Sequence, residues 1–210
     1  MTKVNPISAL FVDIGGVFLT NGWDRNNRAM AASHFGLDLN ELDSRHRLTF
    51  DTFEIGKISL DEYLYRIVFY EKRNFTMEEF KIFMFSQAEA FHEMIDLITK
   101  LKNKYSLKVV AVSNEGRELT EYRIKNFNLT LFIDYFIVSS FVHFRKPDTD
   151  IFKLAIDMAQ TDLEQIIYID DRLMFVEVAK TLGLRGIHHS DYYSTKKKLE
   201  QSGLIMSNEF

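Results

Sequence analysis

Hydrophobic residues follow two different patterns along this chain of 210 residues. Short apolar runs rich in β-branched residues predict buried strands, and they lie at 7–13, 107–113, 135–140, 165–170 and 184–189. Between the later runs, apolar residues recur at helical spacing and predict helices at 116–126, 149–160, 172–182 and 192–201. This alternation of strands and helices is typical of a parallel sheet with helices on both faces.

A long helical stretch interrupts the alternation after the first strand. Almost all of 24–105 has helical periodicity, and "SLDE" at 59–62 and "TMEE" at 76–79 have the capping-box pattern of helix starts. The sequence therefore predicts an α/β fold, a Rossmann-like doubly wound parallel sheet with an inserted α-helical cap. We expect the core domain at 1–20 and 91–210, and the cap domain at 21–90.

Composition narrows the class of protein. Hydrophobic residues make up 46% of the chain, charged residues 27%, and the formal net charge is −4. A globular protein with a proper core is expected, and the mild acidity argues against nucleic acid as a partner. There is no cysteine, no membrane-length apolar run and no signal-peptide pattern. We expect a cytoplasmic protein, and the sequence does not indicate its oligomeric state.

Polar residues stand where three of the predicted strands end, and a lysine precedes the helix that follows strand three. They are Asp13, Ser113, Asn114, Asp170 and Asp171, with Lys146 in "FRKPDTDIF". Parallel sheets bind ligands at the carboxyl ends of their strands, so these side chains are expected to share one edge. Each residue alone has a simpler interpretation as a turn, a helix cap or a surface lysine. Their joint occurrence in sequence order favours a functional site.

The set has a chemical logic. Clustered carboxylates need a cation, and hard oxygen ligands suit Mg²⁺, which also binds phosphate. Lys146 and the Ser113 hydroxyl can hold phosphate oxygens, and the turn after Asp13 can offer backbone N–H groups. Asp13 itself is a candidate nucleophile that would form a covalent aspartyl intermediate.

These residues resemble the motifs of the haloacid dehalogenase superfamily, in the branch with a small helical cap after the first motif. "FVDIGGV", "VVAVSN", "RKPDTDIF" and "YIDDR" are similar to its four motifs. The resemblance implies that Asp13 is the nucleophile, with Ser113 and Lys146 catalytic. It implies phosphate binding by Ser113, Asn114, Lys146 and Gly16, and Mg²⁺ ligation by Asp13, the Gly15 carbonyl, Asp170 and Asp171.

Two positions depart from the family pattern. Phosphatases of this family usually carry a general acid–base Asp two residues after the nucleophile, where this chain has Gly15. An Asn is common four residues after the second Asp of the last motif, where this chain has Phe175. General acid–base help contributes about 10²–10⁴-fold, so we expect the glycine to affect proton transfer while metal and phosphate binding survive.

Three functions remain open from the sequence. The first is a Mg²⁺-dependent phosphatase of a small phosphorylated metabolite. The second, which the missing acid at Gly15 motivates, is a pseudo-enzyme that binds a phosphorylated ligand or partner. The third is a 2-haloacid dehalogenase, against which the Asp170–Asp171 pair argues because that chemistry needs no metal. The cap is expected to select the leaving group.

Several other features are interpreted as structural. Phe80, Phe83 and Met84 share a helical face and predict the core of the cap. His188 and His189 would point to opposite faces of a strand, so a shared metal is not expected. Trp23 either borders the mouth of the site or packs in the core.

Overall fold

A computed structural model describes residues 6–206, so the ends of the predicted core domain, 1–5 and 207–210, lie outside the described residues. Five parallel strands form one sheet in the order β3-β2-β1-β4-β5. They are β1 (Ala9–Val12), β2 (Lys108–Ser113), β3 (Tyr135–Val138), β4 (Ile166–Asp170) and β5 (Arg185–His188). The first strand lies at the centre, with Ala9 opposite Lys108 on one side and Ile166 on the other.

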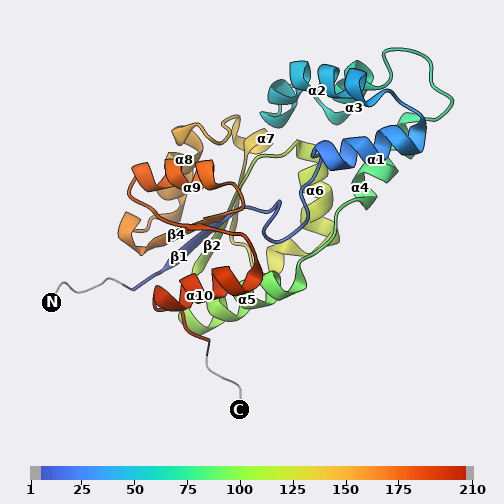
Figure 1. Cartoon of the computed structure of the whole chain (residues 1–210). Helices are drawn as coiled ribbons and strands as arrows, with labels where there is room; N and C mark the ends of the chain where they lie inside the picture. The colour runs from blue at the N-terminus through green and yellow to red at the C-terminus, as the bar shows by residue number, and fades with distance from the viewer. Residues whose placement is uncertain (1–5, 207–210) are drawn as a thin grey trace.

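Helices cover both faces of the sheet, which explains why the strands are apolar throughout. Leu10 and Val12 face α5 (His92–Tyr105) and α10 (Tyr192–Gln201), with α6 (Arg117–Asn126) beside them. Ala9 and Phe11 face α8 (Thr149–Ala159) and α9 (Leu173–Thr181). Figure 1 shows the strands between these two helical layers. The predicted α/β fold is confirmed.

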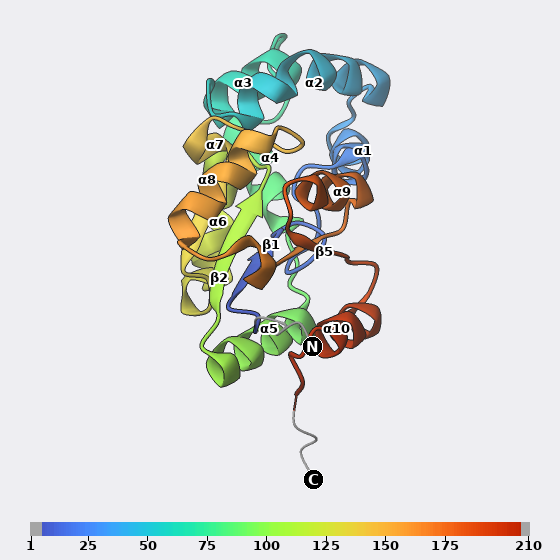
Figure 2. The ribbon, with the colours of Figure 1, turned by 90° about the vertical axis from the view of Figure 1, so that its left-hand side faces the viewer.

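Four further helices between β1 and α5 form a separate hydrophobic core, to which Leu119 of α6 also contributes. They are α1 (Arg25–Phe35), α2 (Leu39–Glu54), α3 (Leu60–Ile67) and α4 (Met77–Ser86). Phe80 and Met84 are buried in this core, as predicted, with Phe83 packed against it. Both predicted capping boxes, at Ser59 and Thr76, are present. Figure 2 shows α2 and α3 at the opposite end of the molecule from α5 and α10.

The third strand is shorter than predicted. Its last paired residue, Val138, lies opposite Ser113, where β2 ends, so no partner backbone is available beyond it. The chain turns into a short helix, α7 (Ser139–Val142), instead. Two 3₁₀ turns, Leu129–Leu131 and Leu163–Gln165, were also not predicted. Within residues 6–206, no helix is both long and apolar enough to span a bilayer.

Candidate active site

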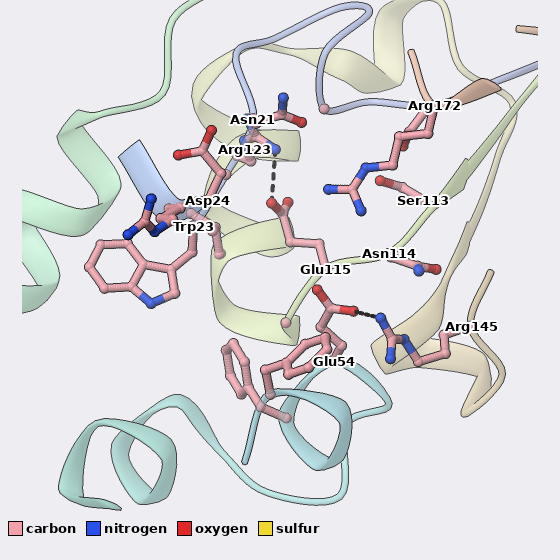
Figure 3. A pocket seen from close by; sticks show the side chains of 18 of the residues that line it. Asn21, Trp23, Asp24, Glu54, Ser113, Asn114, Glu115, Arg123, Arg145 and Arg172 are labelled. Atoms are coloured by element: carbon pink, nitrogen blue, oxygen red, sulfur yellow. Dashed lines mark hydrogen bonds and ion pairs between the residues drawn. The ribbon is translucent and has the colours of Figure 1, made fainter. Parts of the chain in front are cut away.

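The carboxyl edge of the sheet brings the predicted residues together. Asp13 follows β1 and its N–H donates to the Ile169 carbonyl of β4 at 2.9 Å. Ser113 and Asp170 end the neighbouring strands, and Lys146 arrives on the loop between α7 and α8. Asp13, Ser113 and Asn114 line a cavity of about 260 Å³ together with residues of α1 and α2. Figure 3 shows part of its lining.

Lys146 is the centre of a buried ion cluster. Its Nζ lies 2.9 Å from Asp13 Oδ2 and 2.7 Å from Asp170 Oδ2, and the lysine is fully buried. Asp170 also accepts hydrogen bonds from the Tyr168 hydroxyl and, at 2.7 Å, from the Arg172 N–H. These five polar groups are thereby fixed before any ligand arrives.

Opposing effects set the charge of these groups. Burial raises the pKa of Asp13 to about 6, against the lowering effect of Lys146 and a Ser113 hydrogen bond. Burial works against the charge of Lys146, but Asp13 and Asp170 outweigh it and raise the pKa of the ammonium. The ammonium stays charged at neutral pH and favours the ionised form of Asp13.

The aromatic environment of Lys146 explains the unusual Phe175. The Nζ atom lies 5.1 Å from the centre of the Phe175 ring and 5.8 Å from that of Tyr168. Ring faces attract cations at such distances. Phe175 therefore packs beside the lysine, where the family pattern has an amide.

Three carboxylates lie close enough together to bind one divalent cation. One oxygen each of Asp13, Asp170 and Asp171 lie within 4.8 Å of one another. Asp171 Oδ1 is buried and accepts no hydrogen bond within residues 6–206. Burial and the charge of Asp170 raise the pKa of Asp171. An unpartnered buried oxygen beside two further carboxylates fits a hard cation such as Mg²⁺.

The backbone after Asp13 is shaped around Asp171. Gly16 has a φ of +74°, and a Cβ atom there would lie 2.4 Å from Asp171 Oδ2. Its N–H, expected to face phosphate, donates to the Leu19 carbonyl at 2.7 Å, so this amide is engaged within the turn. Gly15 lines the cavity, and ligation by its carbonyl stays a prediction.

Asn114 also has a more specific contact than expected. Its Nδ2 donates to the Lys146 carbonyl and its Oδ1 accepts the Lys146 N–H, both at 2.8 Å. This reciprocal pair fixes the backbone of the lysine. A phosphate contact from the remaining Asn114 hydrogen stays a prediction.

The two histidines and Trp23 have structural partners. His188 Nε2 lies 3.0 Å from the Asp171 carbonyl, and His189 Nδ1 lies 2.8 Å from Thr195 Oγ1. The two rings have separate partners, so the structural interpretation agrees with their contacts. Trp23 lines the cavity, and its Nε1 donates to the Tyr63 hydroxyl at 2.9 Å, so both interpretations of this residue apply.

Several residues of the cavity were missed from the sequence. Glu115 follows Asn114 directly and is 7% exposed, and Arg123 Nη1 donates to its Oε1 at 2.8 Å. Its position after a strand-end motif was an available signal. Glu54 and Arg145 lie 2.9 Å apart but are 91 positions apart in sequence (145 − 54), so no pattern could connect them.

The fold is Rossmann-like, and an ionic site lies at the carboxyl edge of its sheet. Helices α1–α4, called the helical segment from here on, contribute to the cavity at this site through α1 and α2. A family model for haloacid dehalogenase-like hydrolases matches residues 30–188. The chain belongs to the haloacid dehalogenase-like hydrolases. This match begins after Asp13, so the assignment of the first motif depends on the strand-end geometry.

Relatives and solved structures agree with this family. A sesquiterpene phosphatase, astK of Aspergillus oryzae, is 25% identical over 108 residues, 51% of this chain and 55% of that protein. The chain therefore matches about half the length of this curated relative. A HAD (haloacid dehalogenase) family enzyme from Bacteroides thetaiotaomicron, crystallised with magnesium and inorganic phosphate, has a TM-score of 0.74 at 22% identity. That alignment covers 86% of this chain and 93% of the enzyme.

A second structure covers more of the chain. A predicted HAD-like family hydrolase from Porphyromonas gingivalis has a TM-score of 0.74 at 20% identity, covering 94% of this chain and 99% of that one. At these identities the two structures establish a shared fold.

Proposed function

We propose that this chain is a Mg²⁺-dependent phosphatase that hydrolyses a small phosphorylated metabolite through an aspartyl-phosphate on Asp13. The observation that carries the proposal is the joint geometry of Asp13, Asp170 and Asp171, with Lys146 Nζ within 2.9 Å of the first two. The magnesium and phosphate bound by the Bacteroides enzyme and the activity named for the Aspergillus relative support it.

The residues would divide the reaction as follows. A carboxylate oxygen of Asp13 attacks phosphorus, the bond to the ester oxygen breaks, and the leaving alkoxide takes a proton from water. Water then attacks phosphorus and loses a proton to solvent, and the bond to Asp13 breaks to release phosphate. Lys146 and the Ser113 hydroxyl hold phosphoryl oxygens in both steps. Magnesium, held by Asp13, Asp170 and Asp171 with the Gly15 carbonyl, would supply positive charge against the phosphate.

Because residue 15 is a glycine, we expect this chain to differ from related phosphatases in the proton-transfer step. The glycine offers no acid to the leaving oxygen, so solvent has to supply that proton. We expect turnover to fall steeply as the leaving alcohol becomes less acidic, because an unprotonated alkoxide is then a poorer leaving group.

Phosphate release from a panel of phosphate monoesters, with Mg²⁺ and with excess chelator, tests the proposal. We expect release that requires Mg²⁺ and is lost in Asp13→Asn. Release that continues in chelator, or that survives Asp13→Asn, would contradict the mechanism. If no ester releases phosphate, an activated aryl phosphate included, the proposal that this chain is a phosphatase is contradicted.

A second candidate follows from the same glycine. A protein without an acid at position 15 can serve as a phosphate-ligand binding protein that does not turn its ligand over. Thermal stabilisation by phosphate esters without phosphate release would favour that role. Trapping of phosphate covalently on Asp13 would exclude it.

A further inference from the structure

Two carboxylates line the cavity without a part in the chemistry proposed above. Glu115 follows the end of β2 in the core, and Glu54 ends α2 of the helical segment. Figure 3 shows both pointing into the same cavity, each beside an arginine. Because an arginine offsets the charge of each carboxylate, the pair can accept hydrogen bonds from a neutral part of a phosphorylated ligand.

Each carboxylate has an oxygen that needs a donor. Glu115 Oε1 accepts from Arg123 at 2.8 Å, while its buried Oε2 accepts no hydrogen bond within residues 6–206. Glu54 Oε2 lies 2.9 Å from Arg145 Nη2 but at an angle that makes no hydrogen bond. Burial raises the pKa of both groups, against the lowering effect of their arginines. Unsatisfied buried acceptors are costly, so they are usually complemented by a ligand or water.

One buried hydroxyl, that of Ser139, joins the backbones of the two glutamates. The Glu115 N–H donates to Ser139 Oγ at 3.0 Å, and Ser139 Oγ donates to the Glu54 carbonyl at 2.6 Å. Ser139 is fully buried. The backbone positions that carry the two carboxylates are thus linked to each other before a ligand binds.

Two arginines that line the cavity also have a buried donor without a partner among the described residues. Arg123 Nε and Arg145 Nε are buried and make no hydrogen bond in the part of the chain described. A hydroxyl group both donates and accepts, so it can satisfy carboxylates and guanidinium groups together. An ammonium could satisfy only the carboxylates and would be repelled by the arginines. Trp23 and Phe53 offer apolar surface in the same cavity for carbon-bound hydrogens.

We propose that Glu54 and Glu115 select a leaving group rich in hydroxyls, so that the substrate is the phosphate monoester of a polyol or sugar. This inference rests on the proposed phosphatase function and adds its substrate class. A cavity of about 260 Å³ is slightly smaller than most ligand pockets, and its many charged residues favour a small polar leaving group over a long hydrocarbon.

Matched ester pairs test this selection. Glycerol phosphate is compared with propyl phosphate, and a hexose 6-phosphate with hexyl phosphate, by kcat/KM. We expect the polyol ester of each pair to be preferred by about 10- to 100-fold, the range of charge-assisted hydrogen bonds. The leaving alcohol of a polyol ester is also more acidic, so only the part of this preference that Glu54→Ala removes is assigned to the glutamates. A preference for the alkyl esters would overturn the proposal.

Variants identify the residues responsible. Glu54→Ala removes one acceptor, and we expect the polyol preference to fall about 10-fold. Glu41→Ala, on the exposed side of the same helix and outside the cavity, is the matched control and should keep the preference. In Glu115→Gln, Arg123 fixes the remaining oxygen, so a donor replaces the free acceptor and the preference should fall similarly. An unchanged preference in folded Glu54→Ala would overturn the proposal even if Glu115→Gln fails to fold.

Binding to the Asp13→Asn protein separates this inference from the proposed function. Calorimetry with the same ester pairs measures recognition without turnover, and we expect the same preference for polyol esters and the same loss in the Glu54→Ala background. Turnover of esters without any polyol preference would refute only the inference. Polyol-selective binding without turnover in the wild-type protein would refute only the phosphatase.

Discussion

At the scale of single residues, the two glycines after Asp13 have different functions. Gly16 adopts a φ of +74° and leaves space that the Asp171 carboxylate fills. Gly15 has no positive φ, and a Cβ atom there would meet Asn21 Oδ1 at 3.2 Å and Arg123 Nη1 at 3.9 Å. Gly16 is thus required by the site's geometry, whereas Gly15 can accept a side chain with a small shift of Asn21.

Substitution of both glycines by alanine tests this difference. Gly16→Ala should destabilise the fold by at least about 1–2 kcal/mol, because its left-handed backbone disfavours a Cβ. The same Cβ displaces Asp171, so Mg²⁺ affinity should fall about 10- to 100-fold. Gly15→Ala is the control. Urea unfolding and calorimetric Mg²⁺ titration measure both effects, and equal losses in the two variants would contradict the argument.

Gly15→Asp should restore an acid to the proposed phosphatase. The new carboxyl would lie beside Arg123 Nη1, within the cavity that also contains Asp13. We expect kcat for esters of weakly acidic alcohols to rise by at least about 10²-fold, with little gain for activated aryl esters. Gly15→Asn, of the same shape without the acid, is the control. A similar rise in both variants would show that shape rather than proton transfer is responsible.

At the scale of elements, a hydrogen-bonded chain ties α2 and α3 to the segment after β1. Trp23 Nε1 donates to the Tyr63 hydroxyl at 2.9 Å, and this hydroxyl lies 2.6 Å from His46 Nδ1. The Tyr63 proton needs an acceptor because the residue is fully buried, so His46 Nδ1 is unprotonated. Burial and the nearby charge of Arg28 lower the pKa of His46 to about 4.

This histidine predicts a pH dependence of stability. Between about pH 4 and 6.5 the unfolded His46 binds a proton that the folded one does not, so stability rises with pH across that window. After allowance for partial exposure, His46 should reduce the free energy of unfolding by about 1 kcal/mol between pH 7 and pH 5.

Urea unfolding of wild-type and His46→Gln proteins at pH 5 and pH 7 measures this contribution. The difference between the two pH values should shrink by about 1 kcal/mol in the variant. A difference of the same size in both proteins would show that His46 is not responsible.

At the scale of the whole molecule, one buried ion pair joins distant segments. Arg123 of α6 donates to Glu115 after β2 and to the Thr20 carbonyl after β1. Arg123 is 1% exposed, and α6 also contributes Leu119 to the core of the helical segment. The Arg123–Glu115 pair lies where the sheet, helix α6 and the helical segment meet.

Removal of one partner should cost far more than removal of both. Arg123→Met leaves the buried Glu115 without a cation and should destabilise the protein by about 3–5 kcal/mol. The double variant Arg123→Met with Glu115→Leu should be markedly more stable than the single one. Urea unfolding of wild-type, single and double variants gives the comparison, and additive losses would contradict a buried pair.

The sequence by itself determined the fold and the edge where the site lies. Apolar periodicity indicates which residues of a strand or helix are buried. The positions of strands and helix starts along the chain could therefore be predicted, and so could the residues at the strand ends: Asp13, Ser113 and Asp170. These are local properties, or consequences of the rule that parallel strands end on the same edge. The boundaries of core and cap at 1–20, 21–90 and 91–210 stay predictions.

Only the tertiary structure decided what surrounds that edge. Contacts such as Glu54 with Arg145, or Ser139 with both glutamates, join residues dozens of positions apart, and no local pattern encodes which side chains meet there. Packing in three dimensions determines the conformation of Gly16 and the contact of Asn114 with the lysine backbone. It also leaves one oxygen each of Glu115 and Asp171 without a partner among residues 6–206. The strand ends position the reactive residues, and long-range packing determines which side chains line the cavity and which ligand can bind there.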